Sequence, residues 1–163
     1  MKMIKKRRKK FQRIVYRTIH KNKNSGVVTG IVYAIDVQAE PLSALKAKAE
    51  RAGFANLKVR QRNLAEAEGS GLPKSSLDIV LIPNLLFQVE EKEKILREAK
   101  RILKPNGLLV VVDWLKRARL ILNQPYISAA QVKSLAHKLG FALFKEFPSQ
   151  GSHFVLVFKK ENE

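Results

Sequence analysis

Polar residues stand at the ends of three predicted strands, and these residues offer the clearest chemistry. Asp36 closes VYAID, Asn63 and Leu64 follow LKVRQR, and Asn84 follows LDIVLIP. A carboxylate at the end of a parallel strand can accept hydrogen bonds from both hydroxyls of a ribose. An amide side chain beside a backbone N–H can read the edge of a purine, since it both donates and accepts. Structural roles remain open as well, namely a helix cap at Asp36 and polar turns at Asn63 and Asn84.

The elements that must position these residues alternate between strand and helix. Apolar runs predict strands at 31–37, 57–62, 77–82 and 108–114, and amphipathic spacing predicts helices at 41–53 and 90–103, the second ended by a turn in KPNG. Ser128 is expected to cap a third helix, which Gly140 ends. Residues 141–147 and 153–159 are expected to form an antiparallel strand pair.

This pattern predicts an α/β fold: a mostly parallel, Rossmann-like sheet with helices on both faces and an antiparallel strand pair at the carboxyl terminus. Such sheets bind ligands at the carboxyl ends of their strands. The three polar strand ends are therefore expected to face one common crevice. No single residue of this set is informative alone, and the prediction depends on their shared placement.

Composition narrows the classes of function. The 163 residues include no cysteine and three histidines, which excludes disulfides and a cysteine nucleophile and gives no expectation of a metal site. No apolar run reaches the ~18 residues that a membrane helix needs, and the basic start has no apolar stretch typical of a signal peptide. We therefore expect a soluble, cytoplasmic protein.

The net charge of +18 is concentrated at the start of the chain. Residues 1–30 hold eleven Lys and Arg and no acid, so we expect a basic segment at 1–30, either disordered or a substitute strand, and a domain at 31–163. Residues 11–20 fit a helix or a strand equally well. Residues 1–24 are a candidate contact for nucleic acid, and a mobile basic start without a partner is the alternative.

From Ile31 to Lys159 the chain resembles the class I S-adenosylmethionine-dependent methyltransferases, especially the small bacterial and archaeal ones. The resemblance rests on VYAIDVQAEPLSALKAKAERAGFANLKV, on LPKSSLDIVLIPNLLFQVEEKEKILREAKRILKPNGLLVVVDW and on ISAAQVKSLAHKLGFALFKEF. It implies S-adenosylmethionine as cofactor and a methyl acceptor that the sequence does not identify. It gives no catalytic residue.

The resemblance also implies roles for individual residues. Asp36 matches the ribose-binding acid, and Val37 follows it beside the adenine ring. Asn63 stands where the family often has an aspartate that accepts from the adenine amino group, and the backbone amide of Leu64 would meet the ring. Asn84 stands where the sulfonium and the acceptor would approach one another. His153 matches a histidine-containing stretch of close relatives, and a structural role is expected for it.

The chain departs from the family pattern at its start. The family has a strand, a glycine-rich loop and a helix before the strand that corresponds to 31–37, and nothing here resembles that loop; we interpret Val27–Gly30 as the tail of the missing connection. Because the loop supplies backbone donors to the cofactor, its loss predicts weak cofactor affinity. The missing strand would be central, so residues 11–19 are expected to fill the gap, antiparallel to the strand at 31–37, if the sheet is to be complete. Arg13 and Arg17 would then face a space suited to apolar side chains.

Three functions remain open from the sequence. The first is a methyltransferase with an unknown acceptor, in a chain that is truncated relative to the family. The second is an inactive remnant of such an enzyme, arising from a shifted start or reading frame. The third is a nucleic-acid-binding protein that uses its basic arm. The oligomeric state is also open, although an unfilled sheet edge would favour pairing between copies.

Overall fold

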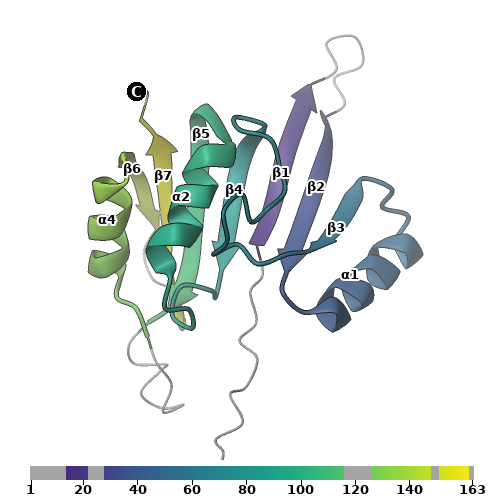
Figure 1. The fold of residues 1–163 in the computed structure, drawn as a ribbon, viewed down its shortest axis with the longest axis horizontal. Helices are drawn as coiled ribbons and strands as arrows, with labels where there is room; N and C mark the ends of the chain where they lie inside the picture. Colours follow the sequence, from purple (N-terminus) through teal and green to yellow (C-terminus); the bar gives the residue numbers. More distant parts are fainter. Residues whose placement is uncertain (1–13, 22–27, 116–125, 148–150, 162–163) are drawn as a thin grey trace, which may run out of the picture.

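The protein forms one mixed sheet that carries helices on its faces (Figure 1). The computed structural model describes residues 14–21, 28–115, 126–147 and 151–161, with side chains described from Gly30 onward. The strands are β1 (Ile14–Lys21), β2 (Val28–Asp36), β3 (Leu57–Gln61), β4 (Leu77–Pro83), β5 (Leu103–Trp114), β6 (Phe141–Phe147) and β7 (His153–Lys160). The helices are α1 (Ala39–Arg51), α2 (Lys92–Ile102) and α4 (Ala129–Lys138).

The seven strands lie in the order β3-β2-β1-β4-β5-β7-β6. β2 pairs parallel with β3, and β4 pairs parallel with β5. β1 is antiparallel to both β2 and β4, and β7 is antiparallel to both β5 and β6. All strands except β1 and β7 therefore run in one direction. The predicted α/β fold with a mostly parallel sheet and an antiparallel carboxyl-terminal pair is confirmed.

β1 occupies the centre of the sheet and runs against its neighbours. Ile14 pairs with Ile35 and Lys21 with Val28, while Val15 pairs with Leu81 of β4. The segment expected to fill the gap thus does so, in the expected antiparallel direction, and it satisfies backbone groups that would otherwise be buried without partners. The side chains of Arg13 and Arg17 lie outside the described part of the structure.

Two expected boundaries are wrong. β2 begins at Val28 and not at Ile31, so Val28, Thr29 and Gly30 belong to a strand and are not the tail of a missing connection. The physical reason is β1, which gives this polar stretch a full set of backbone partners. β5 begins at Leu103 and not at Leu108, because Leu103 already pairs with Leu77; the KPNG stretch forms an irregularity in the strand, with the pairing resuming at Leu108.

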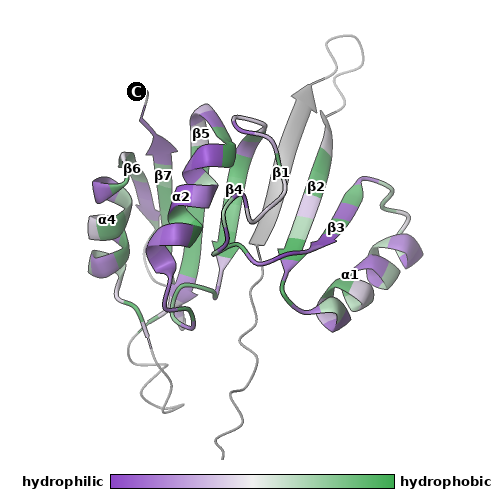
Figure 2. Ribbon diagram, viewed as in Figure 1, coloured by the Kyte–Doolittle hydropathy of each residue, from purple (hydrophilic) through white to green (hydrophobic). Residues whose placement is uncertain are grey.

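The core lies between the sheet and the helices α2 and α4; in Figure 1, α2 stands in front of the sheet near β5, and α4 lies beside β6. Figure 2 shows hydrophobic residues concentrated on β4 and β5, with hydrophilic residues on the outer side of α2. The expected apolar face of α2 is buried, as Ile95, Leu96, Ala99 and Ile102 are at most 1% exposed. Ser128 accepts from Gln131 N and closes a capping box at the start of α4, as its sequence predicted.

The opposite face of the sheet is covered less completely. The connection from β2 to β3 leads toward one edge of the sheet, and the connection from β4 to β5 leads toward the other edge. Because such crossovers are right-handed, α1 and α2 lie on opposite faces of the sheet. α1 contacts β2 and β3. Farther along this face, a group of aliphatic residues of β4 and β5 is partly exposed: Ile79, Leu81, Leu108, Val110 and Val112. Within the described ranges, no helix is long and apolar enough to cross a bilayer.

Candidate functional site at the carboxyl ends of β2, β3 and β4

The carboxyl ends of β2, β3 and β4 lie at one rim of the sheet, the lower edge in Figure 1. β2 and β4 run the same way because both are antiparallel to β1, and β3 is parallel to β2. Asp36 ends β2, Asn63 lies two residues after β3, and Asn84 follows β4 directly. β1 separates β2 from β4, so their axes are ~10 Å apart at this rim. The residues thus face the same edge of the sheet from both sides of β1.

Asp36 joins the end of β2 to the end of β3. It registers with Gln61, and its backbone oxygen accepts from Arg62 N at 3.0 Å. Its Oδ1 accepts from Gln38 N at 2.9 Å, which turns the chain into α1. The residue is 1% exposed, so the carboxylate is covered in this structure. A ribose can reach it only when that carboxylate is uncovered.

Val37, Asn63 and Leu64 lie beside Asp36. Gln61 Nε2 donates to Val37 O at 3.1 Å, which holds the two strand ends together. Asn63 Oδ1 accepts from Ala65 N at 3.1 Å, so the asparagine closes a local turn. Leu64 is fully buried in the core and fixes the position of this turn. The side-chain oxygen of Asn63 is therefore already used within the chain, while the backbone of the turn lines the rim.

Gly69 packs directly on this turn. A Cβ placed on Gly69 would lie 2.2 Å from Asn63 O and 2.9 Å from Leu64 Cα. Both neighbours are backbone atoms, which cannot rotate out of the way as a side chain can. The shape of the rim at Asn63 and Leu64 thus depends on the absence of a side chain at this position.

Asn84 holds a conformation that few residues adopt. Its φ is +51°, in the left-handed region that asparagine tolerates better than most residues. Its backbone N donates to Val112 O at 2.8 Å, and its backbone O accepts from Gln88 Nε2 at 2.6 Å. Its Oδ1 is buried and accepts no hydrogen bond from the described residues. A buried acceptor without a hydrogen bond costs about 1–3 kcal/mol of stability. Asn84 Oδ1 is therefore a candidate to accept a hydrogen bond from a ligand.

Asp113 is a functional candidate that the sequence analysis missed. It is the penultimate residue of β5 and is fully buried. Its Oδ2 accepts from Phe87 N at 3.2 Å, and its Oδ1 accepts from Trp114 N at 2.8 Å. The carboxylate therefore fixes the loop that follows Asn84. An acid at the end of an apolar run, the same signal that pointed to Asp36, could have identified it.

His153 lies beside this part of the rim, in the strand next to β5. Its ring stacks on Trp114 with the centroids 4.1 Å apart, and Ser152 Oγ lies 3.0 Å from its Nδ1. These contacts are consistent with the structural role expected for this histidine. Within the described residues no group of three histidine or acidic side chains is placed to hold a metal ion.

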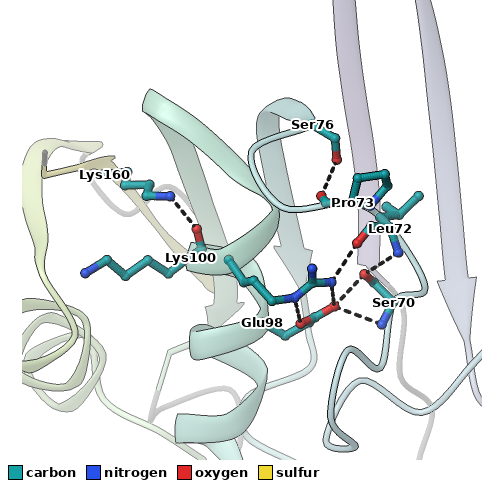
Figure 3. Close-up of polar contacts among 8 residues, drawn as sticks. Ser70, Leu72, Pro73, Ser76, Glu98, Lys100 and Lys160 are labelled. Atoms are coloured by element: carbon teal, nitrogen blue, oxygen red, sulfur yellow. Dashed lines mark hydrogen bonds and ion pairs between the residues drawn. The ribbon is translucent and has the colours of Figure 1, made fainter. Parts of the chain in front are cut away.

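A second missed feature holds the segment between β3 and β4 to α2 (Figure 3). Glu98 Oε1 accepts from Ser70 N at 3.0 Å and from Ser70 Oγ, and its Oε2 accepts from Arg101 Nε at 2.8 Å. Arg101 also donates to Leu72 O at 2.7 Å. Burial raises the pKa of the Glu98 carboxyl, but the hydrogen bonds from Arg101 and Ser70 outweigh it, so the pKa lies below its ordinary value.

Comparison with known proteins identifies the family. The sequence profile of a methyltransferase domain family matches residues 13–152, which is most of the chain and includes β1. The chain belongs to this methyltransferase family. It is 33% identical over 96 residues to an arsenite methyltransferase of Aquipseudomonas alcaligenes, covering 56% of this chain and 28% of that protein. It is 34% identical over 99 residues to a ubiquinone/menaquinone biosynthesis C-methyltransferase of Pseudoalteromonas translucida, covering 60% and 38%.

Solved structures share the fold. A SAM-dependent methyltransferase from Aquifex aeolicus matches with a TM-score of 0.67 at 23% identity, over 78% of this chain and 67% of that one. A SAM-dependent methyltransferase from Methanosarcina mazei matches with a TM-score of 0.62 at 20% identity, over 79% and 81%. The chain spans only about a third of the length of the two curated relatives above.

The residues at this rim can be compared with the two halves of the S-adenosylmethionine that this family uses. On the nucleoside side the chain offers a carboxylate at the end of β2 and the turn at Asn63 and Leu64. The central strand β1 is antiparallel to its neighbours: its first residue, Ile14, lies beside Ile35 at this rim, and its carboxyl end at Lys21 lies at the opposite rim. Within the described residues, no glycine-rich turn therefore follows a central strand at the rim where the methionine part would bind.

Proposed function

We propose that this methyltransferase-family protein binds S-adenosylmethionine at the rim formed by β2, β3 and β4 and transfers a methyl group to an acceptor. The observation that carries the proposal is the placement of Asp36, at the tip of a strand whose neighbour ends in the turn at Asn63. A carboxylate at this position suits the two hydroxyls of a ribose, and the adjoining turn suits a purine edge.

Each residue of the rim has a proposed task. Asp36 accepts from the ribose hydroxyls, and Val37 and the backbone of Leu64 flank the adenine ring. Asn63 contributes less than an aspartate would, because its side-chain oxygen accepts from Ala65 N. Asn84 presents its buried Oδ1 toward the reacting part of the cofactor. These tasks are binding and orientation, which bring the reactants together without a covalent step on the protein.

When bound, the cofactor supplies a methyl group activated by its positively charged sulfur. The chain itself holds the binding rim in place: Asp113 fixes the loop after Asn84, and Gly69 allows the close packing that fixes the turn after β3. Because the methionine side has no glycine-rich turn among the described residues, we expect weaker binding than a complete site would give. Two lost backbone donors to a charged group correspond to about 3–6 kcal/mol.

A second candidate function is a protein that binds the nucleoside but transfers no methyl group. The reversed direction of β1 favours it, because the strand that should lead into the cofactor loop instead leads away from the rim. Binding of the cofactor product without measurable methyl transfer from labelled S-adenosylmethionine would support this candidate over the enzyme.

A third candidate is a contact with nucleic acid through residues 1–24, supported by the eleven basic and no acidic residues at 1–30. It predicts binding that weakens steeply with added salt. Deleting residues 1–24 would be a poor test, since Ile14–Lys21 is a central strand. Replacing Lys5, Lys6, Lys9 and Lys10 with glutamine keeps that strand. RNA or DNA binding that survives this replacement, or that ignores salt, contradicts the candidate.

Titration calorimetry with S-adenosylhomocysteine tests the main proposal. We expect wild-type protein to bind, and Asp36→Asn to bind at least roughly tenfold more weakly, since a neutral amide loses the charge-assisted contacts to the ribose. Asp36→Asn keeps an oxygen for Gln38 N. The matched control is Asp78→Asn, which removes an aspartate charge at the opposite end of the sheet, where Asp78 pairs with Lys104. Absence of binding to wild type at about 5 mM ligand, or equal affinity in Asp36→Asn, would overturn the proposal.

A further inference from the structure

A basic hollow lies at the other end of the sheet, between the carboxyl ends of α2 and α4 and the end of β7. Its volume is about 550 Å³, within the range of small-ligand sites. Apart from Leu139 and Gly140, its lining consists of basic residues: Lys74, Arg97, Lys100, Arg101, Lys138 and Lys160. β7 and α2 both end here, on the rim opposite Asp36.

The cations of this hollow outnumber the carboxylates near them. Glu93 pairs with Arg97 and Lys138, and Glu98 pairs with Arg101. A carboxylate oxygen of Glu161 also lies near Gly140, since it is 3.9 Å from a Cβ placed there. Among the described residues, the six cations of the hollow stand against these three carboxylates, an excess of three positive charges around one concave surface. Like charges gathered in this way raise the local potential and attract anions.

Gly140 and the buried Lys160 bring two of these cations, Lys100 and Lys160, close to the backbone at this point. Gly140 has a φ of +76°, and a Cβ on it would lie 2.7 Å from Lys100 Nζ. The missing side chain therefore leaves room for the ammonium group of Lys100 between the two helices. Lys160 is largely buried, and its Nζ donates to Lys100 O at 2.8 Å (Figure 3). The same Nζ donates to Leu103 O at 2.8 Å.

Helix ends explain part of this charge but not all of it. Lys100, Arg101 and Lys138 lie in the last turns of α2 and α4, where cations offset the negative end of the helix dipole. Lys74 comes from the loop before β4, and Lys160 comes from a strand. Four separate parts of the fold, α2, α4, the loop before β4 and β7, thus bring cations to one point, which the stability of a single helix does not require.

We propose that this hollow binds a small anion that carries two or more linked phosphate groups. Lysine and arginine side chains form short, charge-assisted hydrogen bonds to phosphate oxygens. Among the described residues, the lining includes no aromatic side chain on which a base could stack, so the hollow recognises phosphate and not a nucleobase. Its place on the opposite rim makes the proposal independent of cofactor binding at Asp36.

The test is calorimetric titration of the full chain with inorganic tripolyphosphate at low salt. We expect one site per chain in the wild type and roughly tenfold weaker binding in Lys74→Gln/Lys138→Gln, which removes two exposed cations of the hollow. The matched control is Lys5→Gln/Lys6→Gln, which removes two charges from the basic start and is expected to leave the affinity within about twofold.

Several results would overturn the proposal. No binding of tripolyphosphate to wild type would do so, as would equal weakening in both double variants, since that indicates unspecific attraction by net charge. Binding of an RNA oligonucleotide without binding of tripolyphosphate would instead indicate a nucleic-acid surface. A thermal melt of each variant confirms that the fold is intact, and orthophosphate in a parallel titration shows whether linked phosphates are required.

Discussion

The contact between Glu98 and Arg101 makes the sharpest prediction about stability. The Glu98 side chain is 4% exposed and that of Arg101 is 23% exposed. Glu98→Ala removes the acceptor for Arg101 and leaves Ser70 N without it. Breaking a buried ion pair costs about 3–5 kcal/mol, and the partial exposure of Arg101 places the loss near ~3 kcal/mol. In a protein of this size that lowers Tm by roughly 6–12 °C.

The assay is thermal unfolding at neutral pH, followed by circular dichroism or calorimetry. The matched control is Glu93→Ala, which removes the same charge from the same helix but from an exposed pair with Arg97. Exposed pairs contribute little to stability, so we expect a much smaller loss there than in Glu98→Ala. If both variants lowered Tm equally, the assigned role of Glu98 in fixing the segment between β3 and β4 would be wrong.

Four further predictions follow from single residues. Gly69→Ala should destabilise the fold by about 1–3 kcal/mol in denaturant unfolding and weaken S-adenosylhomocysteine binding, because its Cβ would press on Asn63 O; unchanged stability would contradict the packing. Asn84→Gly should stabilise by ~1 kcal/mol, since it relieves a φ of +51° and removes a buried oxygen, yet weaken ligand binding. Ser128→Ala should cost ~1 kcal/mol of stability through the lost cap, with ligand affinity unchanged. Because the folded-state pKa of Glu98 lies below its ordinary value of 4.5, its stabilisation is present above that value and lost as pH falls, so the stability gap between wild type and Glu98→Gln should narrow in acid; a constant gap would contradict this.

Most strands could be predicted from the sequence because their signal is local. LDIVLI and the alternating LKVRQ carry their own pattern, and β4 and β3 follow it closely. The start of β2 could not be predicted in this way, because Gly30 is typical of turns and separates Val28 and Thr29 from the apolar run at 31–37. They form a strand only because β1 pairs with them, and that pairing depends on the whole sheet.

The candidate site was only partly accessible to sequence reasoning. Asp36, Asn63 and Asn84 could be found because strand ends are local features, and their placement on one rim followed from a mostly parallel sheet. Glu98 could not, since a glutamate on a helix is expected to face solvent, and its partner Ser70 lies 28 positions earlier in the chain. The charge of the basic hollow likewise comes from segments that only the fold brings together.

The central strand β1 runs antiparallel to both of its neighbours, β2 and β4. It completes the hydrogen bonding of the sheet with a strand that enters at the rim of the candidate site. The strand ends of the proposed nucleoside site are present in this sheet, while the described residues contain no glycine-rich turn after a central strand at this rim. The complete sheet and the proposed weak cofactor binding both depend on the antiparallel direction of this one strand.

Backbone amide NMR of the labelled protein, titrated with S-adenosylhomocysteine, tests the central proposal most directly. The account predicts saturable shifts that begin at the segments after β2, β3 and β4, near Gln38, Leu64 and Leu85, with little change at Gly140 on the opposite rim. Shifts that gather away from these three segments, or no saturable shift at all, would contradict a nucleoside site at this rim.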